Sequence, residues 1–558
     1  MRGVVRSIGT LVLLLSGACL GDASAQAPGQ GPARNAAILE YIRSGWDRLS
    51  RSTTECSSLV DPKVTTPPVL YLPFGMTAPE TVVALQTKCH VRLEHLPRTV
   101  VHLGDVRPAE LPAEGLLYLP NRYVVPGGRF NEMYGWDSYF ILLGLLNQNR
   151  DDLARGMVEN FFFEIENYGA LLNANRTYFL TRSQPPLLSS MIRDVYEHPG
   201  TTPLSKEWLA HAYALAERDH ALWTSDIHRI GNTGLARYRD IGAGPVPEMA
   251  DDSSYYPDVI RWLLAHPEAG SNYLLTAPAE PKGAQVEELA RTSCDIRISH
   301  VCERAVVDGH RLTASFFASD RGMRESGFDT SFRFGPFSGS TEDYAPICLN
   351  SLLFKYEVDL AHFATLLGRK QDAARWTAAA EARRAAVNRT MWNAQAGYFY
   401  DWNSRTGKQS TYNDLAGFYP LWTGLATAAQ ASAMEQRLKT FEHAGGLAMS
   451  NTDSGTQWDL PYGWAPTNWL TVAGLERYGF HEDAMRLAKE FSGTVLENFE
   501  RDGTVREKYN VVSGSANVAV AAGYKTNVIG FGWTNGVYLR MHDLLQGTGI
   551  SATSVAQR

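Results

Sequence analysis

The chain lacks the features that mark nucleic-acid-binding, membrane-spanning and metal-binding proteins. Its 558 residues carry a net charge of −7 with no long basic run, so a nucleic-acid partner is not expected. Beyond the N-terminus, no stretch approaches the roughly 18 uninterrupted apolar residues of a membrane helix. There is no CxxC or HExxH pattern, no phosphate-binding loop and no glycine fingerprint after a strand. We therefore expect no metal and no cofactor.

The N-terminus has the pattern of a secretory signal. Two arginines in residues 1–7 precede an apolar run over residues 8–15, and Ala23-Ser24-Ala25 before Gln26 is a suitable cleavage site. We expect a signal peptide over 1–25, a disordered leader over 26–34, and a periplasmic or secreted product with no membrane attachment after cleavage.

Cysteine is scarce, and five cysteines follow the predicted signal: Cys56, Cys89, Cys294, Cys302 and Cys348. An oxidising compartment permits disulfides. The short spacing makes Cys294–Cys302 a reasonable bridge, and Cys56–Cys89 is also feasible, which leaves Cys348 over. The sequence does not decide among the pairings.

Most of the chain after Trp136 reads as a series of amphipathic helices. We expect an all-α fold, a toroid of helical hairpins, in a single catalytic domain over 35–548 followed by a tail over 549–558. The irregular parts are an extended arm over 54–120 and a lid or insertion over 241–320. The predicted helices are 35–51, 138–146, 151–168, 185–197, 205–223, 257–264, 349–367, 372–392, 413–422, 428–441, 464–478, 482–499 and 533–545. The periodicity alone does not separate this toroid from an irregular helical solenoid.

Two polar segments are rich in aromatic residues and glycine: PGGRFNEMYGWDSYF at 126–140 and QWDLPYGWAPTNW at 457–469. Such segments suit a site for a polyhydroxylated ring, because aromatic faces stack on the ring, charged side chains hold hydroxyls, and glycines let the backbone approach. The sequence therefore predicts a carbohydrate site.

Two carboxylates are candidates for acid and base in glycosidic bond hydrolysis. Asp329 has Phe328, Phe332 and Phe334 as neighbours, whose apolar surroundings would raise its pKa, as an acid requires. The alternative is a carboxylate that caps the next turn. Glu507 lies between Arg506 and Lys508, cations that favour an ionised base. The alternative there is a solvated surface residue.

These motifs together resemble the α,α-trehalases of glycoside hydrolase family 37. Besides the two aromatic segments, NANRTYFLTRSQPP at 173–186, ESGFDTSFRF at 325–334, EKYN at 507–510 and GFGWTNGV at 530–537 stand in the family's order. The resemblance covers about residues 35–545. It implies an (α/α)6 barrel and an inverting mechanism, for which the two carboxyls should lie roughly 6.5–9.5 Å apart.

The resemblance also implies roles for individual residues. Asp329 matches the general acid and Glu507 the general base. The matching substrate-binding residues are Arg129, Phe130, Trp136, Asp137, Asn173, Arg182, Gln184, Glu248, Gly327, Trp458, Asp459 and Trp533.

The sequence departs from the family at two polar positions. Val246 stands where the family has an arginine, two residues before Glu248, and Tyr524 stands where it has a glutamate. Both changes affect contacts to the second glucose. A site that loses hydrogen-bonding partners loses discrimination.

The leading hypothesis is therefore an inverting hydrolase that cleaves trehalose to two glucoses. One alternative is an inverting α-glucosidase of the same family with a different leaving group, motivated by Val246 and Tyr524. The other is a non-catalytic sugar-binding protein, which would need neither an acid nor a base. A disaccharide is the expected partner, and a monomer the expected state.

Overall fold

The computed structural model describes residues 32–60, 67–198, 200, 203–248, 254–276, 305–521 and 523–547. The predicted signal peptide and the tail lie outside the described residues, as do most of the leader and both Cys294 and Cys302.

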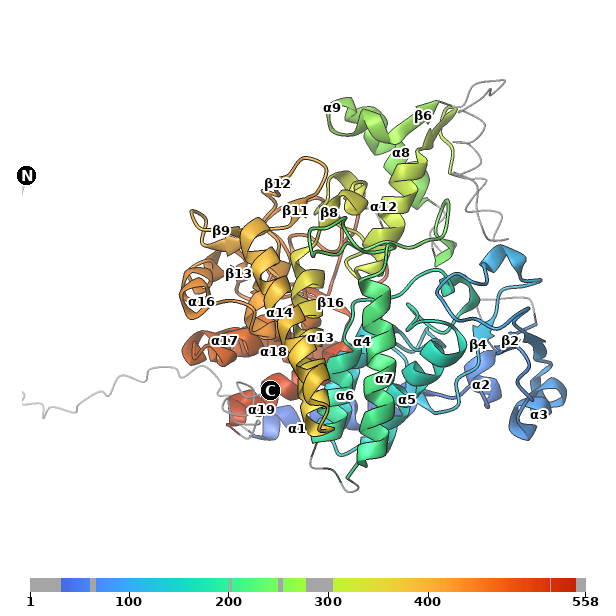
Figure 1. Cartoon of the computed structure of the whole chain (residues 1–558). Coiled ribbons are helices and arrows are strands. Elements are labelled where there is room, and N and C mark those ends of the chain that lie inside the picture. Colours follow the sequence, from blue (N-terminus) through green and yellow to red (C-terminus); the bar gives the residue numbers. More distant parts are fainter. Residues whose placement is uncertain are drawn as a thin grey trace, which may run out of the picture.

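Six of the described helices form a closed inner ring. Figure 1 labels α4, α6, α13, α17 and α19 among them. Each contacts the next in the order α4, α6, α13, α15, α17 and α19, and α19 returns to α4. Their bounds are α4 Gly135–Asn147, α6 Leu188–Glu197, α13 Ile347–Leu366, α15 Tyr419–Thr423, α17 Ala465–Arg477 and α19 Gly532–Gln546. Helix α4 is apolar around its circumference, as expected for a helix that is buried on all sides.

Further helices alternate with the inner ones along the chain. Helix α5 packs on α4 and α6, α7 on α6 and α13, α14 on α13, and α18 on α17 and α19. The bounds are α1 Pro32–Leu49, α5 Asp151–Asn167, α7 Lys206–Trp223, α14 Lys370–Thr390, α16 Ala428–Glu435 and α18 His481–Asp502. This double ring confirms the predicted (α/α)6 barrel.

The ring closes where α4 meets α19, and two glycines make that contact possible. A Cβ on Gly536 would come within 2.0 Å of the carbonyl oxygen of Phe140. A Cβ on Gly144 would come within 2.7 Å of the Cα of Gly536. The two helices therefore touch backbone to backbone.

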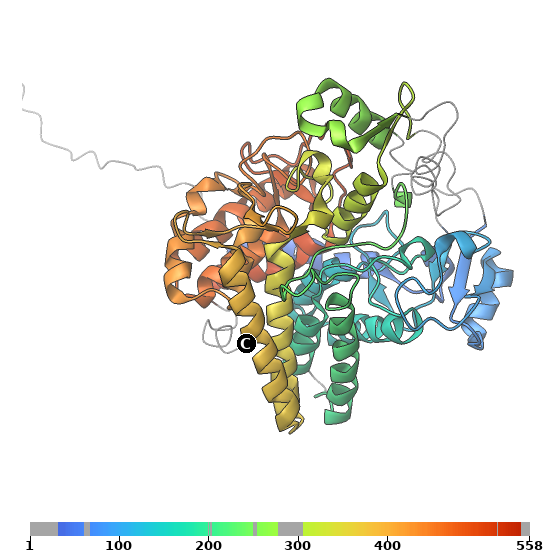
Figure 2. The same cartoon turned by 45° about the horizontal axis from the view of Figure 1, so that its top comes forward.

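The predicted arm over 54–120 forms a small lobe at one side of the barrel (Figure 2). Strand β2 (Val69–Leu72) pairs in parallel with β3 (Arg92–His95) and β4 (Leu116–Leu117). Helices α2 (Cys56–Leu59) and α3 (Glu80–Cys89) join them, and α3 was not expected from the sequence. A disulfide links Cys56 to Cys89, while Cys348 is buried and unbridged.

The described parts of the predicted lid contain helix α8 (Tyr255–Ala265), α9 (Pro267–Gly270) and α12 (Ala314–Glu325), with the antiparallel pair β6 (Leu274–Thr276) and β7 (His310–Leu312). They share a separate apolar cluster that includes Val246, Tyr255, Tyr256 and Phe316. The regular helix α12 was not predicted. It carries four buried charged side chains, so its pattern does not resemble that of an amphipathic core helix.

The other strands are short pairs in the loops. They are β1 Ser50–Arg51, β5 Tyr123–Val124, β8 Tyr344–Ala345, β9 Trp392–Asn393, β10 Tyr398–Phe399, β11 Trp402–Asn403, β12 Lys408–Gln409, β13 Glu442–His443, β14 Gly446–Leu447, β15 Tyr462–Trp464 and β16 Lys508–Asn510. The helix predicted over 413–422 is a 3-10 turn, Leu415–Phe418, followed by α15, and the one predicted over 428–441 ends at Glu435.

None of the helices in the described part is long and apolar enough to span a membrane. No cluster of three or more His, Cys, Asp or Glu side chains there could hold a metal ion.

Candidate active site

Asp329 lies on a loop that leaves the end of α12 through a tight turn at Gly327. Gly327 has φ +77°, and a Cβ there would come within 2.7 Å of the Trp136 ring. Only glycine combines that backbone conformation with such a close approach. The following Phe328 packs edge-on against Trp136, with ring centroids 5.7 Å apart, and against Trp458 at 5.0 Å. The loop is therefore fixed against the first aromatic segment.

The second aromatic segment holds the same loop by its backbone. The amide of Gln457 donates to the carbonyl oxygen of Asp329. The backbone N–H of Trp458 donates to the carbonyl oxygen of Thr330 at 3.0 Å. These bonds fix the two peptide groups around the acid candidate.

Asp459 is fully buried, and its carboxylate accepts five hydrogen bonds from the protein. One donor is the backbone N–H of Phe332 at 2.9 Å, on the Asp329 loop. The other donors are the hydroxyls of Tyr412, Ser450, Ser454 and Thr456. Both oxygens are thus occupied, an arrangement that suits a residue tying loops together more than one contacting a sugar.

Glu507 is brought to the site by the pairing of β15 with β16, in which Trp464 lies opposite Lys508. The fully buried Lys508 ammonium is 3.0 Å from the Glu507 carboxylate, which is itself 15% exposed. The indole N–H of Trp533 donates to the Glu507 carbonyl oxygen at 3.1 Å. Of the two cations expected beside Glu507, only Lys508 pairs with it in the described contacts, since Arg506 pairs with Asp502.

The Asp329 carboxyl is 22% exposed and lies 3.7 Å from the guanidinium of Arg324. Burial raises the pKa of Asp329 to about 7, against the opposing effect of the Arg324 cation. The predicted elevation of this pKa is thus present, and the carboxyl is half protonated near neutral pH.

Asp137, in the first turn of α4, lies within electrostatic reach of both carboxyls. Burial raises the pKa of Asp137 well above its usual range, and the charges of Glu507 and Asp329 raise it further. Asp137 is 4% exposed. The acid candidate, the base candidate and Asp137 therefore share one site.

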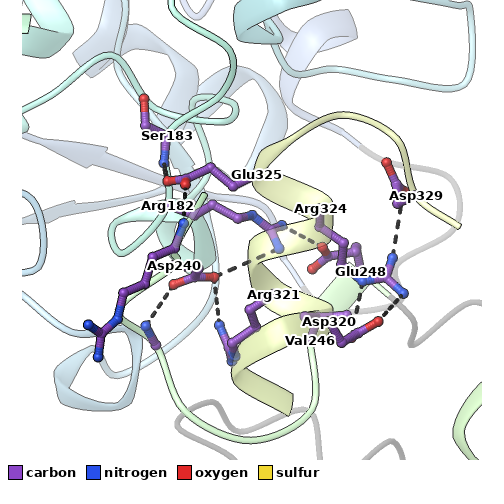
Figure 3. Close-up of polar contacts among 12 residues, drawn as sticks. Arg182, Ser183, Asp240, Val246, Glu248, Asp320, Arg321, Arg324, Glu325 and Asp329 are labelled. Carbon is purple, nitrogen blue, oxygen red and sulfur yellow. Dashed lines mark hydrogen bonds and ion pairs between the residues drawn. The ribbon is translucent and has the colours of Figure 1, made fainter. Parts of the chain in front are cut away.

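Arg182 and Glu248 form a buried ion pair beside Asp329 (Figure 3). Arg182 also lies 3.8 Å from Asp240 and stacks over the Phe179 ring at 4.8 Å. Arg182 Nε and Nη1 and Glu248 Oε2 are buried and make no hydrogen bond within the described residues. Polar atoms buried without a hydrogen bond lower the stability of the fold.

The remaining predicted polar residues support the first aromatic segment. Gln184 accepts from the backbone N–H of Trp136 at 2.8 Å. The Asn173 carbonyl oxygen accepts from the N–H of Gly135 at 3.0 Å, and the Asn173 N–H donates to Arg182. Arg129 lies over the Phe130 ring at 5.4 Å.

Four indoles form one connected platform. Trp136 packs on Trp458 and Trp533 at 5.8 and 5.6 Å, and Trp458 stacks on Trp464 at 3.9 Å. Trp464 was not singled out from the sequence. A platform of this kind beside two carboxyls suits a sugar ring.

The two departures from the family lie on the side of the site formed by α12. Val246 is fully buried in the apolar cluster of the lid region. The hydroxyl of Tyr524 accepts from Arg324 at 2.9 Å. Sequence reasoning missed Arg324 and its partner Asp320, although their i,i+4 spacing just before the ESGFD motif was a usable signal.

The trehalase family model matches residues 84–546 of the chain. The chain belongs to the trehalase family. A probable trehalase of Eremothecium gossypii is 34% identical over 556 residues, which cover 88% of this chain and 70% of that protein. A cytosolic neutral trehalase of Saccharomyces cerevisiae is 36% identical over 449 residues, which cover 75% of this chain and 56% of that protein.

A solved structure agrees with this assignment. A neutral trehalase from Saccharomyces cerevisiae superimposes with a TM-score of 0.73 at 30% identity, and covers 93% of this chain and 97% of that one. The predicted family and the predicted enzyme class, a glycoside hydrolase of the trehalase kind, are confirmed.

The predicted location is wrong by the same comparison. Relatives from several fungi are named cytosolic neutral trehalases, which contradicts a periplasmic or secreted trehalase. The inference rested on a short basic and apolar N-terminal pattern, and such a compositional match is weaker than the similarity of the folded chain.

Proposed function

We propose that this trehalase hydrolyses α,α-trehalose to two glucoses by inversion, with Asp329 as general acid and Glu507 as general base. Asp329 gives its proton to the bridging oxygen as the bond from the anomeric carbon to that oxygen breaks. Glu507 takes a proton from the water that attacks the same carbon from the opposite face.

The observation that carries this proposal is the contrast between the two carboxyls. Burial raises the pKa of Asp329 to about 7, so a proton is available there at neutral pH. Glu507 has a buried lysine ammonium 3.0 Å from its carboxylate, and this ion pair holds the carboxylate in place. Both keep an exposed fraction, so substrate and water can reach them.

The substrate-binding roles follow from the surroundings of Asp329. We propose that Trp136, Trp458 and Trp533 stack on the sugar and that Arg182 and Glu248 bind its hydroxyls. The position of this ion pair beside Asp329 supports this, because a disaccharide bound at the acid would lie next to it.

Proton NMR of fresh products tests the mechanism. Inversion of one anomeric centre should give one β-glucose and one α-glucose per trehalose. Early appearance of the α anomer alone would contradict inversion. Asp329→Asn and Glu507→Gln should each lower kcat by roughly 10²- to 10⁴-fold. Turnover that survives Asp329→Asn would remove Asp329 as the acid, whereas no turnover by the wild type would favour a sugar-binding protein.

Val246 and Tyr524 favour a second candidate function, hydrolysis of a different α-glucoside by the same mechanism. An apolar residue and a phenol on the side of the acid alter the hydrogen bonds offered to a leaving sugar. Values of kcat/KM for trehalose, kojibiose, nigerose, maltose and an aryl α-glucoside decide this point. Trehalose should rank first, and a much higher value for another glucoside would reassign the leaving group.

We expect a monomer, which light scattering on the purified protein checks.

A further inference from the structure

Arg324 is the last basic residue of α12 and lies one turn before Gly327. Its guanidinium is 2% exposed. It donates through Nε and Nη2 to the carboxylate of Asp320, at 3.3 and 3.4 Å, and through Nη1 to the hydroxyl of Tyr524 at 2.9 Å. The same Nη1 lies 3.7 Å from Oδ2 of Asp329 (Figure 3).

Asp320 and the tyrosines that bind it fix the position of this guanidinium. Asp320 is fully buried and accepts from the hydroxyls of Tyr255 and Tyr256 at 3.1 and 2.8 Å. The guanidinium also stacks over the Tyr255 ring at 5.2 Å. A cation held on two edges and one face has little freedom to move.

Tyr524 connects this cation to the substrate side of the site. Its hydroxyl oxygen accepts from Arg324, which leaves the hydroxyl hydrogen to be donated to a different acceptor. The side chain is half-buried. A hydroxyl oriented in this way can donate to a hydroxyl of the leaving sugar, next to the carboxyl that protonates the leaving oxygen.

We propose that Arg324 is a positioning residue for the reaction: anchored by Asp320, it holds the carboxyl of Asp329 and the hydroxyl of Tyr524 in register with each other and with the leaving sugar. This proposal rests on the proposed function, in which Asp329 is the general acid.

The charges around Asp329 come from several elements. Arg182 and Glu248 face it from the loops before α6 and α8, Asp137 from α4, Tyr524 from the segment before α19, and Arg324 from α12. Arg182 is engaged by Glu248. Arg324 opposes the pKa elevation of Asp329 more strongly than the other charged groups do. Loss of its charge should therefore keep Asp329 protonated to higher pH.

The test compares Arg324→Gln with Arg324→Lys in pH profiles of kcat/KM for trehalose. In the glutamine variant the alkaline limb should move up by about one pH unit, and kcat at the optimum should fall by roughly ten- to a hundredfold, as for a misplaced catalytic group. In the lysine variant the limb should stay within a few tenths of the wild-type position. A glutamine variant with an unmoved limb and unchanged kcat, or a lysine variant that shifts equally, would overturn the proposal.

Two further variants separate positioning from folding. Tyr524→Phe keeps the cation beside Asp329 and removes only the hydroxyl, so it should raise KM for trehalose and leave the alkaline limb in place. An unchanged KM would remove Tyr524 from the proposal. Arg383→Gln breaks a comparable buried pair, Arg383–Glu357, between α14 and α13. Its folded fraction should keep the wild-type pH profile, and a shifted limb there would show that the effect of Arg324 is not local.

The activity of Asp329→Asn distinguishes failure of the proposed function from failure of the positioning role of Arg324. If that variant remains active, the proposed function fails whatever Arg324 does. If it is inactive while the Arg324 variants behave as wild type, only the positioning role fails.

Discussion

Burial of the Asp329 carboxyl raises the pKa that the acid needs and lowers the free energy of unfolding. Its carboxyl has an ordinary pKa near 3.8 in the unfolded chain and about 7 in the folded protein. Between these values the folded state holds a proton that the unfolded state releases, so the free energy of unfolding falls as the pH rises through this window. The elevation that makes Asp329 an acid therefore weakens the fold at neutral and alkaline pH.

This linkage predicts the behaviour of Asp329→Asn. The amide cannot ionise, so at pH 8 the variant should have a higher Tm than the wild type although it is inactive. Near pH 4 the difference should shrink, because both proteins then carry a neutral group. Calorimetry across this pH range checks it, and a difference that does not depend on pH would mean that burial does not raise this pKa.

The same pKa predicts the alkaline limb of activity. Since the acid must be protonated, kcat/KM for trehalose should fall above a pH of about 7, the pKa of Asp329. Initial rates in a series of constant-ionic-strength buffers measure this limb. A limb two units higher would assign the proton to another group.

At the scale of elements, the turn between α12 and Asp329 depends on a single glycine. Gly327→Ala should lower kcat by more than tenfold, because the turn needs positive φ and the new Cβ meets the Trp136 ring. Gly479→Ala is the matched control, since Gly479 has φ +82° but nothing within 4 Å of a Cβ. It should lose about 1 kcal/mol of stability and keep full activity. Equal activity losses in both variants would exclude a specific role for the contact with Trp136.

The loop of the second aromatic segment gives a second test at this scale. Asp459→Asn places an amide donor among five hydroxyl and N–H donors, so it should cost roughly 1–3 kcal/mol of stability and also lower kcat. Asp453→Asn, at an exposed position on the same loop, should change neither. Denaturant titrations and steady-state kinetics on both variants measure the two effects. Loss of stability with unchanged kcat would show that Asp459 does not position the acid.

The sequence predicted the elements whose burial follows a periodic pattern. Helices such as α5 and α18 have one apolar face, and their bounds were found to within a few residues. Helix α12 was missed because Asp320, Arg321, Arg324 and Glu325 are all buried there, paired with groups distant in sequence. Charge that is buried by long-range pairing looks like surface charge in a sequence.

The site could be predicted as far as its motifs extended. The motifs named Asp329, Glu507, Trp136 and Arg182, and the fold brings these into one region. They could not show that the carboxylate of Asp459 is used up by protein donors, or that a cation from α12 stands beside the acid. The first fact depends in part on Phe332, a donor 127 residues away in the chain, and the second on a helix that was not foreseen.

At the scale of the whole molecule, a disulfide cross-links the small lobe over residues 54–120, which lies apart from the catalytic residues. The Cys56–Cys89 disulfide closes a loop of 33 residues, for which the loss of chain entropy on cross-linking predicts about 3–4 kcal/mol. Cys89→Ser should therefore lower the stability of this lobe by that order and leave kcat unchanged at temperatures where the protein is folded. Unfolding curves with and without reductant check it. Reductant should not affect the variant, and a variant as stable as the wild type would mean that the bridge adds nothing.

The closure of the ring by α19 on α4 has a consequence for synthesis on the ribosome. In a nascent chain, Trp136 and Asp137 leave the exit tunnel long before Glu507 and Trp533. Until then α4 lacks α19, the helix that packs against its Gly144. The catalytic centre therefore cannot be complete until Glu507 and Trp533 have emerged, so activity starts only after α19, the last helix of the inner ring, has been synthesised.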